Sequence, residues 1–540
     1  MIDFLSKFPY ETCRPEQEKV LNEIANNWDK KKYFIIEAPV GIGKSGIAKA
    51  VANACSSSFI ITETKQLQEQ YMRDFKSDKQ FISIKGKANY ECKRNPRLNC
   101  ENGPCNVHSG SGMPDCYKQC MKTCNYFSLK EKALKTPEVL TNYAFLFKAF
   151  SYSSCWTPRQ LMVFDECHLL EDQLVNFASF ELNPKELNDT YGLYDRFEDR
   201  NEWLKPFTES GWEGNKVRFE DNLKIIDKVR LELWDDIKHE LGDADSENLD
   251  EDEIEMLGSL HKLYFNISRL QKKMVVFKEQ NKDNWIIAPN EEGALVFTPL
   301  YIDSLFNKFC KNWAQKFLFM SATILDTDGF INELGINKEE CLVIKMDSTF
   351  DPAKSPIYFM PCGSMSYANI DKTLPKACDI INKILISKKD VKGIIHTGNY
   401  KVAKTIYNSI NNSRLLMKVT DEISNQNLLN VHIRSKNSVL MSPSMTTGLD
   451  LKDDLSRFQI IVKLPFESLA DNRIKTKSNM DSKWYSINML KMLIQACGRS
   501  TRSAEDYSTT YILDSSFAYY FNKYKKYLPK DFVNRIKGIE

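Results

Sequence analysis

Glu37-Ala-Pro-Val-Gly-Ile-Gly-Lys-Ser45 follows a short apolar run, Tyr33–Ile36, and precedes a segment of small and apolar residues. The apolar run predicts a buried strand, and the segment after Ser45 has the spacing of a packed helix. A strand, a glycine-containing turn and a helix start together form a phosphate cradle, because backbone N–H groups and the helix dipole both favour anions there. The stretch therefore predicts a P-loop within an α/β sheet.

The individual residues of this stretch have distinct expected roles in binding ATP. Pro39, Gly41 and Gly43 would shape the turn, Lys44 would reach the β- and γ-phosphates, and Ser45 would ligate Mg²⁺. Ala38 stands where the full pattern has glycine, although the two later glycines still supply the turn. The alternative is a glycine-rich turn before an ordinary helix.

Length, charge and apolar content set limits on the class of protein. The 540 residues predict three or four domains, and a net charge of +2 places any nucleic-acid site in a local groove. The chain contains no apolar run of 18 residues and starts without a signal-peptide pattern, so we expect no membrane segment. A cytoplasmic location is expected, with a nucleoid-associated one, or the host cytoplasm for a phage protein, as variants.

The pattern of apolar residues divides the chain into six segments. Two α/β regions are predicted, and the first is interrupted by a Cys-, Gly- and Pro-rich segment and by a charged helical one. The first α/β region covers 1–84, 131–174 and 284–344, the Cys-rich segment 85–130, the helical segment 175–283, and the second α/β region 345–540.

Two further motifs supply what nucleotide hydrolysis needs beside a P-loop. Asp165 and Glu166 end an apolar strand; the first would hold Mg²⁺ and the second would orient the attacking water. His168 would link this site to Ser321-Ala-Thr323. The third motif, from Gln495 to Arg502, supplies a catalytic glutamine and two arginines. Arg499 and Arg502 share one helix face and would neutralise charge on the γ-phosphoryl group.

Residues at other strand ends and near the N-terminus have two interpretations each. Arg14 and Gln17 are placed to pair with an adenine edge, or they lie on a solvated helix face. Thr62 and Thr64 end a strand, where open α/β sheets bind ligands, so their hydroxyls would grip a phosphate backbone or cap a helix.

The cysteines are clustered. Six of the 15 lie between residues 92 and 124, and in a reducing compartment such clustering favours a metal site over disulfides. An iron–sulfur cluster and a structural zinc ion would use the same thiolates.

These motifs, in this order, resemble those of the superfamily 2 DNA helicases of the XPD/DinG type. The resemblance spans nearly the whole chain, and its departures, Ala38, Val40 and Cys167, remove no group that touches phosphate or metal. It rests on Arg14–Gln17, Glu37–Ser45, Thr62–Gln70, Lys85–Cys92, Thr141–Leu146, Asp165–His168 (a DEAH-type box), Ser321–Thr323, Gly448–Leu451 and Gln495–Arg502.

The resemblance implies two RecA-like motor domains with parallel sheets. It places an iron–sulfur domain (85–130) and a helical arch (175–283) as insertions in the first motor domain. It also implies contacts to DNA by Thr62, Thr64, Asn142, Tyr143, Ser442, Thr447 and Gly448, and to ATP by Asp450. Tyr143 as a buried core residue is an equal alternative.

The resemblance also ranks the cysteines as ligands of a [4Fe–4S] cluster. Cys92 and Cys124 match the family's outer ligands, and Cys105 and Cys120 are favoured for the middle pair, with Cys116 and Cys100 in reserve.

The motifs and the resemblance together predict an ATP-dependent DNA helicase that unwinds duplex or forked DNA as a monomer. Movement 5′→3′ on single-stranded DNA is what the resemblance implies. ATP, Mg²⁺ and a [4Fe–4S] cluster are its expected cofactors, and DNA repair is one of several pathways that fit. Two alternatives remain: a translocase that strips protein or RNA from DNA without unwinding it, and a non-enzymatic, zinc-containing DNA-binding scaffold.

Overall fold

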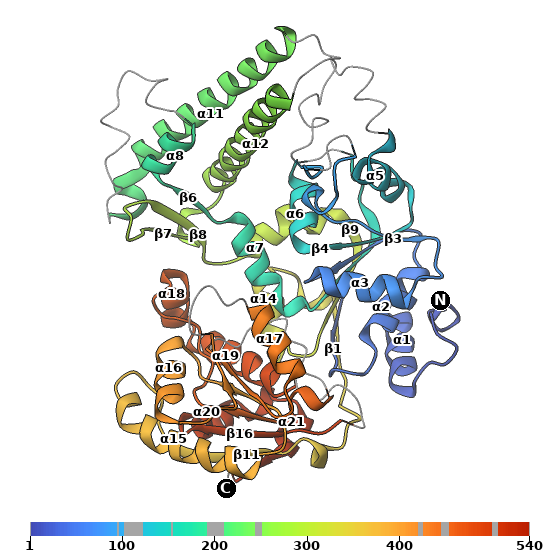
Figure 1. Cartoon of the computed structure of the whole chain (residues 1–540). Coiled ribbons are helices and arrows are strands. Elements are labelled where there is room, and N and C mark those ends of the chain that lie inside the picture. Colours follow the sequence, from blue (N-terminus) through green and yellow to red (C-terminus); the bar gives the residue numbers. More distant parts are fainter. Residues whose placement is uncertain are drawn as a thin grey trace.

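The computed structural model of the chain describes residues 2–93, 97–101, 122–152, 155–191, 210–243, 251–418, 425–443, 453–498 and 506–538. Two sheet-containing lobes lie one above the other, and a pair of long helices projects from the upper lobe (Figure 1). None of the helices in these ranges is long and apolar enough to cross a membrane.

The first lobe is built on a seven-stranded parallel sheet. Its central strands are buried along almost their whole length, because helices cover both faces, and this explains their nearly continuous apolar sequences. In order across the sheet the strands are β10 (Cys341–Lys345), β1 (Tyr33–Glu37), β9 (Ala314–Ser321), β5 (Arg159–Asp165), β2 (Ser58–Thr62), β4 (Glu138–Asn142) and β3 (Phe81–Ser83).

Helices on the two faces of this sheet form two separate hydrophobic clusters with it. The cluster that contains Ile36 and Ile47 lies beneath the P-loop helix, and the one that contains Phe164 and Phe319 lies on the opposite face. The helices are α1 (Pro15–Asn27), α2 (Lys44–Asn53), α3 (Lys65–Asp74), α5 (Asn125–Lys135), α6 (Tyr143–Tyr152), α7 (Leu170–Ala178), α13 (Asp303–Phe309) and α14 (Thr327–Glu333).

The projecting helices form a hairpin on a small sheet of their own. The hairpin consists of α11 (Gly211–Asp243) and α12 (Glu251–Glu279), which lie within the segment expected to be helical. Beneath it, β7 (Trp285–Pro289) and β8 (Leu295–Pro299) form an antiparallel sheet with β6 (Phe180–Leu182), near α8 (Pro184–Tyr191) (Figure 1). β7 and β8 therefore belong to the base of the hairpin and not to the large sheet, although both lie in the segment 284–344 that was assigned to the first α/β region.

The second lobe has another seven-stranded parallel sheet. Its strands, in order, are β13 (Leu415–Leu416), β14 (Val439–Ser442), β12 (Gly393–His396), β15 (Phe458–Ile461), β16 (Thr509–Asp514), β11 (Ile357–Gly363) and β17 (Ile536–Lys537). Its helices are α15 (Ile370–Ser387), α16 (Tyr400–Ser409), α17 (Asn425–Arg434), α18 (Asn472–Met480), α19 (Ser482–Cys497), α20 (Ser516–Tyr524) and α21 (Lys530–Arg535).

The two parallel sheets with helices on their faces confirm the predicted fold class of two RecA-like motor domains. Strands such as β1, β5 and β15 were predicted because they are apolar runs buried on both faces. Sequence analysis named no strand at β3, β6, β10, β11, β13 or β17. Four of these, β3, β6, β13 and β17, have only two or three residues, too few to show a period.

A buried ion cluster anchors the P-loop helix to the sheet, and it generates a first prediction. Lys49 Nζ lies 2.6 Å from Glu138 Oε2 and 2.5 Å from Asn53 Oδ1, and it also contacts Asp78. Burial raises the pKa of Glu138, and Lys49 opposes that shift. Lys49→Met would leave Glu138 uncompensated, so we expect a loss of about 3–5 kcal/mol in the free energy of unfolding.

The measurement is the midpoint of urea unfolding, followed by circular dichroism. Lys135→Met is the matched control, because Lys135 pairs with Glu131 on the exposed surface of α5 and should leave the midpoint unchanged. Equal midpoints for the two variants would contradict the prediction.

Candidate active site

The P-loop leaves β1 at its carboxyl end and leads into α2. Gly41 and Gly43 both have φ = 86°, a left-handed conformation that disfavours any side chain, and Gly43 is the residue that precedes the first turn of α2. Space is also restricted: a Cβ on Gly41 would meet the ring of Phe350, and one on Gly43 would meet the amide of Gln17. Both glycines are therefore required by backbone geometry and by close packing.

Arg14 and Gln17 lie against this loop. Arg14 Nη1 donates to Gly41 O at 2.7 Å, and Gln17 Nε2 donates to Ile42 O at 2.9 Å. The solvated-face alternative does not fit Gln17, whose side chain is buried. Both residues hold the P-loop backbone in place, and pairing with an adenine edge stays a prediction.

Three charged groups converge next to the loop. Lys44 Nζ lies 3.9 Å from Glu166 Oε1 and donates to Ala38 O at 3.2 Å. Asp165 ends β5, and its Oδ2 accepts a hydrogen bond of 2.9 Å from Tyr71 Oη. Burial, helped by the neighbouring Glu166, raises the pKa of Asp165 to about 6, with Lys44 opposing. A buried carboxylate with a raised pKa suits a divalent cation, which would supply the missing countercharge.

His168 connects this site to two other parts of the chain. Its Nδ1 lies 2.8 Å from Ser321 Oγ, which shows the predicted link to the segment 321–323. Its Nε2 lies 2.7 Å from Gln495 Nε2, and the same amide donates to Thr323 Oγ1 at 2.8 Å. Because Gln495 lies near the end of α19, the second lobe reaches directly into the site of the first.

Glu37 is a residue of this site that sequence analysis missed. Its buried carboxylate accepts hydrogen bonds from the backbone N–H groups of Ile324 (2.8 Å) and Leu325 (2.6 Å), and Lys345 lies 2.9 Å away. Leu325 has φ = 61°, and these bonds hold it in that conformation. A lone glutamate at a strand end carries no sequence signal for contacts with residues nearly 290 positions away.

Eight of the predicted site residues lie outside the described ranges. They are Arg499, Arg502, Asp450, Thr447, Gly448, Cys105, Cys116 and Cys120.

The predicted DNA contacts need a correction at three positions. The side chains of Thr62, Tyr143 and Ser442 are buried, so none of them lies on a surface that DNA could touch. Tyr143 Oη donates to Asp165 O at 3.2 Å, and Thr62 Oγ1 donates within the sheet, which supports the core alternative for Tyr143. Thr64 and Asn142 are half-buried; Thr64 Oγ1 caps α3 and Asn142 Oδ1 accepts from Phe145 N.

The structure describes three of the six clustered cysteines. Cys92, Cys100 and Cys124 are all buried, and Cys100 Sγ lies 3.5 Å from Cys124 Sγ. Backbone bonds from Cys92 N to Leu98 O and from Cys100 N to Tyr90 O hold Cys92 and Cys100 on one small turn. From the sequence, Cys100 was predicted only as a substitute ligand, behind Cys105 and Cys120. Among the described residues, no three metal-ligating side chains come together.

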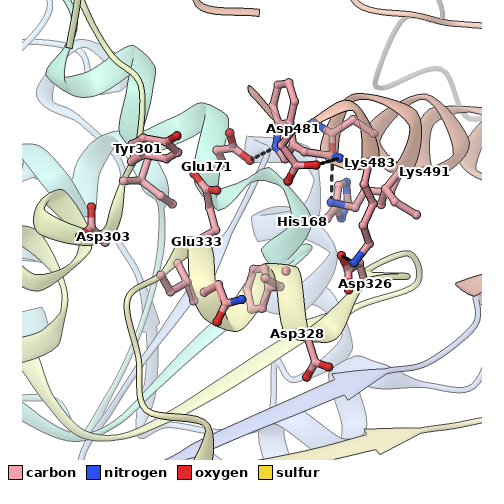
Figure 2. Close-up of a pocket in the computed structure, with 18 of the residues that line it drawn as sticks. His168, Glu171, Tyr301, Asp303, Asp326, Asp328, Glu333, Asp481, Lys483 and Lys491 are labelled. Carbon is pink, nitrogen blue, oxygen red and sulfur yellow. Dashed lines mark hydrogen bonds and ion pairs between the residues drawn. The ribbon is translucent and has the colours of Figure 1, made fainter. Parts of the chain in front are cut away.

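A cavity of about 480 Å³ lies between the lobes beside His168. Residues of both lobes line it, and acidic side chains are prominent among them (Figure 2). Lys483 of α19 crosses it to reach Asp326 Oδ2 at 2.5 Å.

Comparison with protein families gives two matches, one in each lobe. The model described as "Helicase C-terminal domain" matches residues 383–535, and the model described as "Type III restriction enzyme, res subunit" matches residues 11–186. A probable ATP-dependent helicase of Methanocaldococcus jannaschii is 21% identical, over 95% of this chain and 93% of its own length.

Solved structures share the whole fold. An XPD helicase matches with a TM-score of 0.66 and 16% identity, covering 96% of this chain and 98% of its own. Xpd4 of S. tokodaii matches with a TM-score of 0.59 and 15% identity, covering 97% and 99%. These findings confirm the resemblance to XPD/DinG-type superfamily 2 helicases on which the predicted fold was based.

The shared amide of Gln495 yields a second prediction. Since Gln495 Nε2 contacts both His168 and Thr323, Gln495→Ala and His168→Ala break the same interlobe contact. Losing about 1.5 kcal/mol of hydrogen bonding should slow ATP turnover about tenfold in each single variant. The double variant should be less impaired than the product of the two single losses, because one of the contacts that each change removes is shared.

Turnover is measured as phosphate release at saturating ATP. Gln70→Ala, on the exposed side of α3, is the control and should turn over at the wild-type rate. Multiplicative losses in the double variant would show that the two side chains act independently.

Proposed function

We propose that this chain, an ATP-dependent helicase of the XPD/DinG type by its fold and its matches in both lobes, translocates 5′→3′ on single-stranded DNA and unwinds duplex or forked DNA. The observation that carries the proposal is the contact of Gln495 with His168 and Thr323. A site completed by both lobes can convert a change in nucleotide state into lobe movement.

Each residue of the site has a role in ATP hydrolysis that its position supports. Lys44, at the start of α2, would contact the β- and γ-phosphates, and the backbone N–H groups around Gly41 and Gly43 would surround them. Mg²⁺, held by Ser45 and Asp165, would neutralise charge on the phosphates. Glu166 would orient the attacking water, since its left-handed backbone (φ = 53°) turns its carboxylate towards Lys44.

His168 would couple the position of Glu166 to the second lobe. Its ring lies within 3.3 Å of Glu166 Oε2 on one side and contacts Gln495 on the other. A shift of Glu166 on loss of the γ-phosphate would therefore be transmitted to α19. We assign to Arg499 and Arg502 the neutralisation of transition-state charge, which the resemblance implies.

The proposed lobe boundaries follow the sequence segments. Residues 1–84, 131–174 and 284–344 would form the first motor domain and 345–540 the second, with insertions at 85–130 and 175–283. The boundary between the two motor domains at residue 345 is supported by β10, the last strand of the first sheet along the chain, which ends at Lys345. For DNA, Thr64 and Asn142 remain the described candidates at the edge of this sheet.

For the Cys-rich segment we propose a [4Fe–4S] cluster held by Cys92, Cys100, Cys124 and one of Cys105, Cys116 and Cys120. The donor set fits, because thiolates ligate such clusters and the Cys100 and Cys124 side chains are buried and in contact. Burial, with the neighbouring Cys124, raises the pKa of Cys100 to about 12, which a metal would reverse. Such a cluster would stabilise a segment that has little apolar core of its own.

A third prediction tests the motor. Lys44→Ala should lower the rate of DNA-stimulated ATP hydrolysis by about a hundredfold or more, because it removes a group that stabilises the transferring phosphoryl group. Strand displacement from a 5′-tailed duplex with ATP and Mg²⁺ should be lost with it. Lys19→Ala, at an exposed position on α1, is the control.

The same assay separates the alternatives. A wild-type protein that hydrolyses ATP and moves on DNA but never opens a fork would be a translocase without unwinding. Activity only on 3′-tailed duplexes would reverse the proposed polarity, and undiminished ATPase in Lys44→Ala would refute the assignment of the site.

A fourth prediction concerns the cluster. Cys100→Ser and Cys124→Ser should each lower the iron content of the purified protein and bleach its visible absorbance, because each would remove one of four ligands. Cys155→Ser is the matched control, since Cys155 is exposed and lies outside the cysteine cluster. Full iron content in Cys100→Ser would show that Cys100 is not a ligand of the cluster. Zinc in place of iron in the wild-type protein would refute the proposed iron–sulfur cluster.

A further inference from the structure

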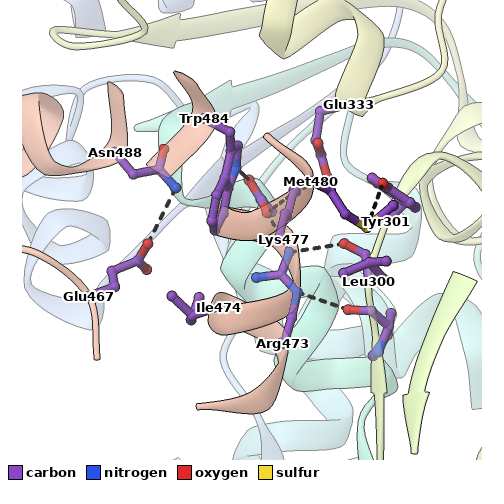
Figure 3. Close-up of polar contacts among 12 residues, drawn as sticks. Leu300, Tyr301, Glu333, Glu467, Arg473, Ile474, Lys477, Met480, Trp484 and Asn488 are labelled. Atoms are coloured by element: carbon purple, nitrogen blue, oxygen red, sulfur yellow. Dashed lines mark hydrogen bonds and ion pairs between the residues drawn. The ribbon is translucent and has the colours of Figure 1, made fainter. Parts of the chain in front are cut away.

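A group of buried and half-buried polar side chains joins the two lobes at a second place, away from the P-loop. It consists of Glu171 on α7 and Glu333 on α14 in the first lobe, and of Arg473 and Lys477 on α18 and Trp484 on α19 in the second. We call this group the interlobe clamp. Figure 3 shows it between Glu333 and Trp484, with Arg473 and Lys477 pointing towards the first lobe.

Glu171 is the centre of the clamp. Its Oε1 accepts from Lys477 Nζ at 2.6 Å and from Arg473 Nη2, and its Oε2 accepts from the indole N–H of Trp484 at 3.2 Å. One carboxylate thus holds three side chains of the second lobe, which come from two different helices.

The cations have further partners in the first lobe. Lys477 Nζ also contacts Glu333 Oε1 at 2.6 Å, and Arg473 Nε donates to Pro299 O at 2.8 Å. The ammonium of Lys477 lies 4.5 Å from the ring centre of Trp484, a favourable cation–π distance. Arg473, Lys477 and Trp484 therefore all donate hydrogen bonds from the second lobe to acceptors in the first.

The two cations of the clamp are buried, whereas the side chains of Glu171 and Glu333 keep 16% and 15% exposure. Lys477 is 2% exposed and Arg473 4% exposed. Burial alone would raise the pKa of Glu171, but Lys477 and Arg473 lower it to about 2, so Glu171 is the ionised partner. Burial and the nearby Glu171 raise the pKa of Glu333, with Lys477 opposing.

A cluster of this kind is a poor way to gain stability. Taking ions out of water costs several kcal/mol per ion, and apolar side chains of similar volume often hold an interface as well or better. Ion pairs with matched hydrogen bonds do impose one relative orientation, which apolar contacts do not. The clamp is therefore better explained by the orientation that it gives to α18 and α19.

The clamp shares its elements with the hydrolysis site. Glu171 is three residues after His168, and Trp484 lies on the same helix, α19, as Gln495. The first-lobe segment that contains His168 and Glu171 thus touches α19 at two points, Trp484 near its start and Gln495 near its end. Eleven residues of helix separate these points, a distance of about 16 Å.

Resting on the proposed function, we propose that the interlobe clamp is a positioning device for ATP hydrolysis, in which Glu171, Arg473, Lys477 and Trp484 orient α19 so that Gln495 reaches His168 and Thr323. α19 packs its apolar face into the core of the second lobe, and Lys483 near its start also reaches Asp326 of the first lobe. The clamp adds contacts near the start of α19 to the contact of Gln495 near its end, so that together they set how α19 lies against the first lobe. The 480 Å³ cavity lies between the two attachments, bounded by Glu171, Trp484 and His168 (Figure 2).

The fifth prediction concerns a variant without the positive charge of Lys477, which contacts both Glu171 and Glu333. Lys477→Met should lower kcat for DNA-stimulated ATP hydrolysis by about tenfold, because a small misplacement of a site residue has a large effect on rate. KM for ATP should change less than about twofold, since the P-loop and its neighbours are untouched. Lys477→Arg, which keeps the charge, should retain most of kcat. Trp484→Phe, which loses the N–H and the smaller ring of the indole but keeps an aromatic side chain, should give a smaller loss than Lys477→Met.

The matched control is Lys530→Met. Lys530 forms an ion pair of 3.1 Å with Asp347, in the segment that joins the lobes, but both side chains are exposed. The same substitution there should leave kcat and KM at wild-type values. An equal fall in kcat in Lys530→Met, or wild-type kcat in Lys477→Met, would overturn the proposal.

Hydrogen–deuterium exchange gives a readout that needs neither ATP nor DNA. Amides of α18 and the first turns of α19 should exchange faster in Lys477→Met and Trp484→Phe than in the wild type, while those of β1 and α2 should not change. Unchanged exchange in α18 and α19 would overturn the clamp. A wild type without ATPase activity would refute the proposed function instead, and the exchange data would still test the clamp.

Discussion

A nucleotide site divided between two lobes works only where the lobes meet, and among the described residues the side-chain amide of Gln495 makes such a contact beside the P-loop. Gln495 Nε2 touches both His168 and Thr323, and each of these belongs to a different strand end of the first sheet. Parallel sheets place all their carboxyl ends at one edge, so the P-loop, Asp165 and the segment 321–323 are adjacent without any further device. A side chain of the second lobe that reaches this edge therefore contacts several site residues of the first lobe at once.

Charge burial has different consequences at the two interlobe contacts. At the hydrolysis site, burial and the neighbouring Glu166 raise the pKa of Asp165, and a bound divalent cation would favour its ionised form. At the interlobe clamp, Glu171 already has its cations, and they come from the other lobe. The first arrangement is suited to binding a metal, and the second to holding an orientation.

Much of the site could be predicted because its residues occur in short, ordered motifs. Lys44, Asp165, Glu166, His168 and Gln495 were all identified from sequence, and the structure brings them to one edge of the first lobe. The errors concern burial: Thr62 and Tyr143 end or follow strands as a DNA contact would, yet both side chains pack inward. A motif places a residue along the chain and says little about which way its side chain points.

The sequence by itself determined the fold class, the P-loop and the acidic strand end, because these depend on apolar periodicity and on residues that are neighbours in the chain. Only the tertiary structure decided that Glu37 holds Leu325, that Cys100 lies against Cys124, and that Glu171 joins Arg473, Lys477 and Trp484. Such contacts join groups separated by 24 to more than 300 positions. Their partners are chosen by the packing of sheets and lobes, which no local pattern records.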